Sequence, residues 1–422
     1  MLLDTYGRVA TDLRVSLTDR CNLRCTYCMP EEGLQWLGKS DLLTDDEIVR
    51  LIRIAVTHLG ITEVRFTGGE PLLRPGLVGI VERCAALEPR PRMSLTTNGI
   101  GLKRTAQALK AAGLDRVNVS LDTLRPEVFK TLTRRDRHKD VIEGMAAARD
   151  AGLTPVKVNA VLMPGLNEDE APDLLAWAVE NAYELRFIEQ MPLDAQHGWK
   201  RDGMITAGDI LQSLRTRFTL TEEGAEERGS APAERWVVDG GPATVGVIAS
   251  VTRPFCGACD RTRLTADGQI RTCLFATEES DLRAALRSGA PDEEIARLWK
   301  VAMWGKKAGS GLDDPSFLQP DRPMSRSAAE PRTAPAQRGV PSLRLHPLAQ
   351  RHHVLEESAD PEELRQVLAV LLARQPRLAP FGRVQLGVVP RQDPDGGVAA
   401  ALGRTAGDLV GAGGVGGSHD PT

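Results

Sequence analysis

Six of the seven cysteines in this chain of 422 residues form two triplets. The first triplet has the spacing Cys-x3-Cys-x2-Cys and the second Cys-x2-Cys-x13-Cys; their members are Cys21, Cys25 and Cys28, then Cys256, Cys259 and Cys273. Thiolates are the soft ligands that iron–sulfur clusters require, and such clusters usually take four of them. Three cysteines would leave one iron of each cluster free to bind a small molecule. Two such sites predict a catalyst that handles its substrates directly at iron.

Disulfides and zinc are the alternative explanations of the triplets. Disulfides suit small secreted proteins, whereas this chain is long and its N-terminus, MLLDTYGRVATDLR, has no apolar signal segment. Zinc is the stronger alternative because Cys-x2-Cys is a common half-site for it, but neither triplet has a fourth Cys or His nearby at zinc spacing. The seventh cysteine, Cys84, is expected to be a buried small hydrophobic residue in a helix at residues 77–87.

Composition indicates a large soluble enzyme. The hydrophobic fraction of 41% and the charged fraction of 26% are ordinary for globular proteins. No run approaches the roughly 20 apolar residues that a membrane span needs. The net charge of −4 argues against a nucleic-acid surface, so anion binding should be local. Reduced thiols and the lack of a targeting segment predict a cytoplasmic protein.

Short β-rich runs alternate with longer helical patterns from residue 12 to about residue 190. Strands are expected at residues 12–17, 62–67, 92–97, 115–121, 155–162 and 183–189. Helices are expected between them at residues 44–60, 77–87, 102–113, 140–152 and 168–181. Strand–helix repeats of this kind build a parallel sheet, and six of them can curve into a barrel. The predicted fold class is therefore α/β, with a partial (βα)6 TIM-like barrel over residues 1–200.

Ligands of such sheets lie at the carboxyl ends of the strands. The informative segments follow successive strands: the first cysteine loop, then GGEP, TTNG and SLD. We therefore expect one site assembled from several loops.

The pattern changes after residue 200. Residues 201–320 combine helices with strand-like runs at 235–239 and 244–251, and they carry the second triplet. A smaller α+β domain that holds the second cluster is expected there. Residues 321–422 are an atypical tail rich in Arg, Pro, Ala and Gly, which is expected to be largely disordered.

The first triplet has an aromatic residue before its last cysteine, and GGEP follows a later strand; together they resemble the radical S-adenosylmethionine superfamily. Within it, the chain resembles the GTP 3',8-cyclase family, which performs the first step of molybdenum cofactor biosynthesis. The motifs that carry this resemblance are TDRCNLRCTYCMP, VRFTGGEPLLR, LTTNG, VNVSLD, RFIEQMP and the distal Cys-x2-Cys-x-Arg-x-Arg-x9-Cys. They span residues 8 to about 324 and imply two 4Fe–4S clusters, one at each triplet, with S-adenosylmethionine as a further cofactor.

The resemblance also implies two sets of binding residues. The positions that match the family's S-adenosylmethionine contacts are Tyr27, Gly69, Ser120 and Met191. Those that match its GTP contacts are Arg14, Arg65, Thr96, Lys157, Arg261, Thr262 and Arg263. Arginine suits oxygen-rich anions because its planar fork donates two hydrogen bonds at once. Singly, Met191 is as well explained by core packing and Ser120 by a strand-end hydrogen bond. The positions Arg14, Arg65, Thr96 and Lys157 are each, taken singly, more often solvated surface residues, whereas jointly the barrel geometry favours a site.

The implied reaction begins with reductive cleavage of S-adenosylmethionine at the first cluster. The resulting 5'-deoxyadenosyl radical abstracts hydrogen from the 3' position of GTP, carbon 8 of guanine is attacked, and reduction gives (8S)-3',8-cyclo-7,8-dihydroguanosine 5'-triphosphate. The second cluster would bind guanine. No catalytic residue is expected beyond the cluster ligands.

The family implies an electron donor such as flavodoxin or ferredoxin and is compatible with a homodimer. The alternatives are another radical S-adenosylmethionine enzyme with an auxiliary cluster, or a binding protein that has lost catalysis.

One feature departs from the family pattern. Family members end in Gly-Gly soon after the equivalent of FLQPDRPMS, whereas here Ser325 is followed by RSAAEPRTAPAQ. We therefore expect a catalytically impaired cyclase that still binds both clusters. Restoring a Gly-Gly end after Ser325 should raise its activity.

Overall fold

The computed structural model describes residues 1–224, 228–312, 314, 317–320, 391–392 and 398–399. The chain divides into two compact units, Met1–Thr333 and Ala334–Thr422. In the second unit the described strands are β15 (Arg391–Gln392) and β16 (Val398–Ala399), which pair antiparallel. The expectations about a disordered tail and a missing Gly-Gly end fall outside the described residues and stay predictions.

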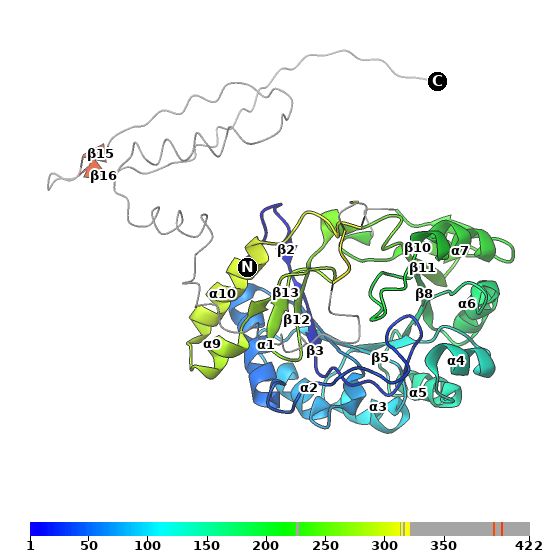
Figure 1. The fold of residues 1–422 in the computed structure, drawn as a ribbon, viewed down its shortest axis with the longest axis horizontal. Coiled ribbons are helices and arrows are strands. Elements are labelled where there is room, and N and C mark those ends of the chain that lie inside the picture. The colour runs from blue at the N-terminus through cyan, green and yellow to red at the C-terminus, as the bar shows by residue number, and fades with distance from the viewer. Residues whose placement is uncertain (225–227, 313, 315–316, 321–390, 393–397, 400–422) are drawn as a thin grey trace, which may run out of the picture. The chain divides into compact units, whose positions relative to one another are not determined.

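Six parallel strands form the centre of the first unit, in the order of the sequence. These strands are β3 (Asp12–Ser16), β4 (Glu63–Thr67), β5 (Arg92–Thr97), β6 (Arg116–Ser120), β7 (Lys157–Ala160) and β8 (Glu184–Ile188). The helices that connect them are α1 (Asp45–Leu59), α2 (Leu77–Ala85), α3 (Leu102–Ala111), α4 (Pro126–Thr133), α5 (His138–Asp150) and α6 (Ala171–Glu180). Figure 1 shows these helices as an arc outside the curved sheet. The predicted partial barrel is confirmed, and only α4 was not expected.

Local sequence signals explain the boundaries of α1. The Thr44 side chain accepts a hydrogen bond from the backbone of Glu47, and the Glu47 side chain accepts one from the backbone of Thr44, which completes a capping box. At the other end Gly60 adopts φ 80°, a left-handed conformation that glycine reaches without strain. The apolar face of α1 is buried, as the spacing of its hydrophobic residues predicts.

The segment after residue 200 adds strands to both edges of the same sheet. At the β8 edge lie β11 (Thr244–Ile248), β10 (Glu234–Val238) and β9 (Leu220–Glu222). At the β3 edge lie β12 (Arg261–Leu264), β13 (Gln269–Arg271) and β14 (Ser280–Asp281). Because β12 pairs parallel with β3, residues about 250 positions apart in sequence become neighbours. This pairing places the second cysteine triplet beside the first strand of the barrel.

The remaining described strands and α-helices of the first unit lie outside this sheet. They are the hairpin of β1 (Leu2–Leu3) and β2 (Val9–Ala10), and the helices α7 (Ala207–Leu214), α9 (Arg283–Arg287) and α10 (Asp292–Trp304). None of the helices in the described part of the chain combines the length and apolarity needed to traverse a bilayer.

Strand alternation separates the core from the barrel interior. In β3, Leu13 and Val15 are fully buried within the hydrophobic core, whereas Arg14 and Ser16 face a cavity inside the barrel. Cys84 is buried in the same core, which confirms its predicted structural role.

Candidate functional site

A cavity of about 390 Å³ lies inside the barrel and brings both cysteine triplets together. All six cysteines line it, and all six are free thiols. Its volume is within the range of small-molecule sites, roughly 300–1,000 Å³. The segments GG, TTN and Ser120 with Asp122 also contribute lining residues, so the expected assembly from successive loops is confirmed.

The first cysteine loop is held by its own backbone and by α4. The amides of Cys28 and Met29 both donate to the carbonyl oxygen of Cys25, at 2.9 and 3.1 Å. The amides of Arg24 and Thr26 donate to the carbonyls at the end of α4, at 3.0 and 2.9 Å. These bonds fix the residues on both sides of Cys25. A helix absent from the sequence-based expectation is therefore part of the support for this site.

The thiols of the first triplet lie in surroundings that disfavour added negative charge. Burial raises the pKa of Cys21 to about 12 and raises that of Cys25 well above its ordinary value. Donors near Cys21 Sγ are neutral: the Leu23 amide at 3.5 Å and the Asn98 side-chain amide at 3.9 Å. A positively charged metal centre at these thiols would supply compensating charge.

Two buried carboxyl groups, those of Glu70 and Asp122, lie next to the first cysteine loop. Glu70 accepts hydrogen bonds from Thr97 Oγ1 at 2.7 Å and from the amides of Asn98 and Leu72 at 2.7 and 2.9 Å. Burial raises its pKa to about 7 despite these donors. Asp122 accepts from the Tyr27 hydroxyl at 2.7 Å and from the Val161 amide at 2.9 Å. Burial raises the pKa of Asp122 to about 6.

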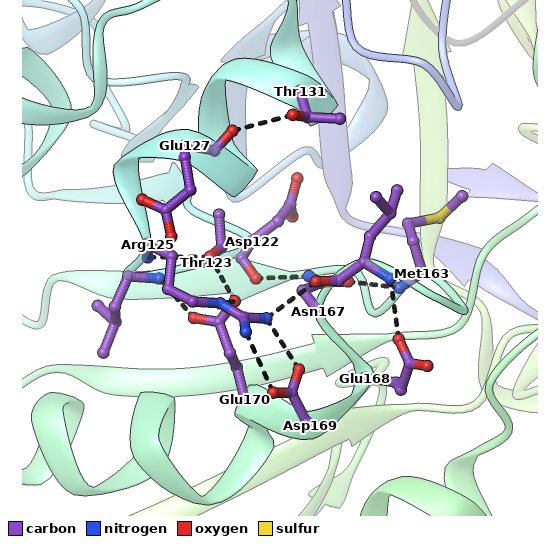
Figure 2. A network of polar contacts seen from close by, with 12 residues as sticks. Asp122, Thr123, Arg125, Glu127, Thr131, Met163, Asn167, Glu168, Asp169 and Glu170 are labelled. Atoms are coloured by element: carbon purple, nitrogen blue, oxygen red, sulfur yellow. Dashed lines mark hydrogen bonds and ion pairs between the residues drawn. The ribbon is translucent and has the colours of Figure 1, made fainter.

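A polar network fixes Asp122 from the outside of the barrel (Figure 2). Asn167 Nδ2 donates to the Asp122 carbonyl at 2.7 Å, and Thr123 Oγ1 donates to Glu170. Arg125 then donates through Nε to Glu170 at 2.8 Å and through Nη2 to Asp169 at 2.8 Å. The loop after β6 is thus tied to the segment that begins α6. Tyr27, which bonds to Asp122, is held by the same network.

All four expected S-adenosylmethionine contacts line the cavity: Tyr27, Gly69, Ser120 and Met191. The glycine has a structural reason of its own. A Cβ on Gly69 would lie 2.3 Å from the carbonyl oxygen of Arg20, and the Gly69 amide donates to Thr18 at 2.8 Å. Glycine therefore lets the end of β4 approach the first cysteine loop, a purpose that the sequence analysis did not foresee.

Five of the seven expected GTP contacts line the cavity, namely Arg14, Arg65, Thr96, Arg261 and Arg263. Thr262 is fully buried, and its hydroxyl accepts a hydrogen bond from Trp299 Nε1 at 3.1 Å. Strand alternation explains this, because Thr262 stands between two arginines that face inward. Lys157 precedes the cavity-lining Asn159 by two positions in β7, and its ammonium lies 2.7 Å from Glu184. The structure thus leaves the Thr262 side chain and the Lys157 ammonium out of the cavity lining.

The arginines form a buried cationic wall. Arg263 pairs in register with Arg14, and Arg14 with Arg65, on three adjacent strands. Asp12 is the acid nearest to Arg14 and Arg65, 3.6 Å from each. Burial, followed by mutual repulsion with Arg65, lowers the pKa of Arg14 to about 9, and burial lowers that of Arg65 to about 10. Both guanidinium groups therefore remain charged at neutral pH.

Hydrogen-bonding capacity in this wall is unused. The Nε atoms of Arg14, Arg65, Arg186 and Arg261 are buried without a hydrogen-bond partner among the described residues. Arg186 and Arg271, which also line the cavity, were missed in the sequence. The signal was present: Arg186 lies in RFIEQMP at a cavity-facing strand position, and Arg271 precedes Cys273 by two residues. A buried group of cations with free donors is a site for a polyanion.

The second cysteine loop has cationic surroundings. Burial raises the pKa of Cys259, but Arg261 and Lys306 outweigh burial and lower it overall. Arg8, from the N-terminal hairpin, donates to the Cys256 carbonyl at 2.7 Å. Arg271 Nη2 donates to the carbonyl oxygens of Leu274 and Ala276, at 3.1 and 2.6 Å, in the loop that carries Cys273.

The donor set at each triplet fits an iron–sulfur cluster. Each supplies three free thiols on the wall of one cavity, which is the ligand type that such clusters take. Within the described residues, no group of three or more His, Cys, Asp or Glu side chains is arranged so that it could hold a single metal ion.

Comparison with known proteins gives consistent matches along the first unit. Residues 15–178 match the family "Radical SAM superfamily" and residues 183–312 match "Molybdenum Cofactor Synthesis C". The chain is 88% identical over 325 residues to "GTP 3',8-cyclase" of Streptomyces coelicolor, covering 77% of this chain and 95% of that relative. It is 63% identical over 324 residues to the protein of that name from Mycobacterium sp. strain KMS, covering 77% and 92%. It is 61% identical over 328 residues to "GTP 3',8-cyclase 2" of Mycobacterium tuberculosis strain H37Rv, covering 77% and 91%.

Proposed function

The chain belongs to the GTP 3',8-cyclase family of radical S-adenosylmethionine enzymes, and we propose that its two cysteine loops and its cationic wall divide the work of that reaction. It is a radical cyclase that acts on GTP in molybdenum cofactor synthesis. Its cofactors are S-adenosylmethionine and two 4Fe–4S clusters.

The first triplet would hold the cluster that meets S-adenosylmethionine. When bound, that cluster supplies the single electron that breaks the sulfonium bond. The chain positions the cysteine loop and Tyr27. The end of α4 accepts hydrogen bonds from the backbone around Cys25, and Asp122 accepts one from the Tyr27 hydroxyl. Gly69, Ser120 and Met191 lie on the same cavity wall and would contact the methionine and adenosine parts.

The buried cationic wall is the observation that carries the substrate assignment. Arg14, Arg65, Arg261 and Arg263 point into one cavity, and three of them have Nε donors without partners. A triphosphate brings enough negative charge and oxygen acceptors to satisfy them, and charge-assisted hydrogen bonds are the stronger kind. Arg186 and Arg271 extend this wall and are added here to the proposed contacts. Thr262 would contact GTP through its backbone. Lys157 would contact GTP through its side chain, once that side chain is released from Glu184.

Positioning is the main contribution of the protein to the chemistry. No cavity residue needs to act as a general base, because the step that activates GTP moves a hydrogen atom from the 3' carbon of the ribose to the 5' carbon of deoxyadenosine. The second triplet would hold the cluster that receives the guanine end. Holding the two carbons within reach and excluding water account for the selectivity expected of such a site.

The proposal extends to the electron donor, the oligomeric state and the location of the protein. A one-electron donor of the flavodoxin or ferredoxin class would reduce the first cluster. A homodimer is compatible with the fold. A cytoplasmic location suits the free thiols, which reducing conditions preserve.

Isotope transfer tests the proposed function directly. The full chain, reconstituted anaerobically with iron and sulfide, is incubated with S-adenosylmethionine, a reductant and GTP deuterated at the 3' carbon. One deuterium should appear in 5'-deoxyadenosine, together with a cyclised nucleotide that has the mass of unlabelled GTP, because the deuterium lost from the 3' carbon is replaced by one electron and one proton. Deuterium-free 5'-deoxyadenosine at normal yield would refute hydrogen abstraction from this position.

A further inference from the structure

A buried lysine reaches the second cysteine loop from outside the barrel. Lys306 lies two residues after the end of α10 and is 4% exposed. Its ammonium donates to the carbonyl oxygen of Arg261 at 2.9 Å and to that of Cys259 at 3.2 Å. It also lies 3.4 Å from Cys259 Sγ, within hydrogen-bonding distance for sulfur.

The acceptors of this lysine do not balance its charge. Among the described residues they are two neutral carbonyl groups and one sulfur. Burying an ammonium without an opposite charge is costly, so lysine is rarely buried unless paired. The sulfur of Cys259 becomes the missing anion only when it is a thiolate, as it is when it ligates iron. The position of Lys306 is thus explained by a negatively charged centre at this loop.

Two further cations around this loop, Arg8 and Arg271, act on its backbone. Arg8 and Arg271 donate to backbone carbonyls, at Cys256 and in the loop after β13, and so hold the chain that carries the cysteines. Lys306 holds the backbone as well, and its ammonium also lies 3.4 Å from a ligand sulfur. At Cys21 of the first triplet, the backbone amide of Leu23 and the side-chain amide of Asn98 that approach the sulfur are uncharged.

We propose that Lys306 is a positioning residue of the second cluster, which orients Cys259 and raises the reduction potential of that cluster by placing a positive charge at its ligand sulfur. The inference rests on the proposed assignment of the second triplet as cluster ligands. Its physical basis is simple. Reduction adds one negative charge to a cluster, and a nearby cation and an N–H donor to sulfur both stabilise the reduced form.

The test isolates the second cluster in the full chain. Cys21, Cys25 and Cys28 are replaced by Ala so that only the second triplet can bind iron, and the protein is reconstituted anaerobically. In this background Lys306→Met removes the charge, and Lys306→Arg keeps it. Lys307→Met is the matched control, because it removes the same charge from the next residue, whose side chain is exposed. Iron and sulfide content, a redox titration followed by electron paramagnetic resonance, and the rate of iron loss to a chelator are measured.

The expected result is a cluster with a more negative reduction potential in Lys306→Met, while Lys306→Arg and Lys307→Met stay close to the parent. Iron loss to the chelator should be roughly tenfold faster in Lys306→Met, the scale on which ligand-supporting residues act. A Lys306→Met protein that keeps its fold by circular dichroism, fails to hold the cluster and is rescued by Lys306→Arg would also support the proposal.

Two outcomes would overturn it. The first is a fully loaded Lys306→Met cluster with unchanged potential. The second is loss of the fold in both Lys306 variants, which would make Lys306 a residue of general stability. A parent protein that binds no four-iron cluster at the second triplet would refute the ligand assignment itself, and iron analysis distinguishes that failure from the other two.

Discussion

The two cysteine loops offer the same ligands in different electrostatic surroundings. Behind the first lie the buried carboxyl groups of Glu70 and Asp122, and the donors to Cys21 sulfur are neutral. Around the second lie Arg261 and Lys306, which lower the pKa of Cys259. Three thiolates alone therefore do not define the role of a cluster. Under the proposed assignment, the cations around the second loop would stabilise a reduced cluster or a bound anion more than the surroundings of the first loop do.

Removing one cysteine from each loop should separate the two roles most sharply. Cys25→Ala should abolish formation of 5'-deoxyadenosine, because the cleaving cluster cannot assemble. Cys259→Ala should leave some uncoupled cleavage but no cyclised nucleotide. Both products are measured by liquid chromatography and mass spectrometry under anaerobic conditions. Cys84→Ala is the control, because Cys84 lies in the hydrophobic core, and normal cleavage by Cys25→Ala would contradict the assignment of the first site.

The buried acid of the first site should impose a pH dependence on folding. The ordinary pKa of 4.5 for Glu70 is raised by burial to about 7 in the folded chain. Folding thus favours the neutral form of Glu70. Its contribution to the free energy of unfolding is fully present below pH 4.5 and is lost as the pH rises through about 7. The loss is on the order of 3 kcal/mol.

Glu70→Gln isolates this contribution in denaturant unfolding of the ligand-free chain at pH 5 and pH 8. The variant should be less stable at pH 5, because an amide cannot accept all three hydrogen bonds that Glu70 accepts. Its stability should, however, change less between the two pH values than that of the wild type. Equal pH slopes would show that Glu70 is not the titrating group.

Neutralising the cationic wall should weaken GTP binding at the second site. Arg14→Ala, Arg261→Ala and Arg263→Ala should each cost roughly 1.5–3 kcal/mol, about 10- to 150-fold in GTP affinity, since charged hydrogen bonds are lost. Equilibrium binding to the reconstituted protein measures this. Arg92→Ala serves as the control because Arg92 is exposed in β5. Unchanged affinity in all three cavity variants would rule out the proposed substrate wall.

A smaller effect should distinguish the two faces of β12. Thr262→Val removes the hydroxyl that accepts from Trp299, so unfolding free energy should fall by about 1 kcal/mol. GTP affinity should stay at the wild-type value, because the Thr262 side chain faces away from the cavity. Chemical denaturation and the binding assay used for the arginine variants measure both quantities. A large loss of affinity would mean that this side chain turns toward the nucleotide.

Local patterns in the chain allowed much of the barrel to be predicted. The period-two alternation of strands such as residues 12–17, the capping box at Thr44 and Glu47, and the stop at Gly60 all depend on neighbours in sequence. The prediction missed α4, whose eight residues (Pro126–Thr133) follow the SLD segment without a side-chain cap. That helix matters because its carbonyls hold the first cysteine loop.

By itself the sequence determined the ligand types, their spacing and the order of strands and helices, because these are properties of residues close together along the chain. Tertiary structure alone decided that β12 pairs with β3 and so joins Arg263 to Arg14. It also decided that Thr262 faces Trp299 and that Lys306 meets Cys259. Burial and charge at these positions arise from segments distant in sequence. For that reason, the electrostatic difference between the two cysteine loops could not be read from the cysteines.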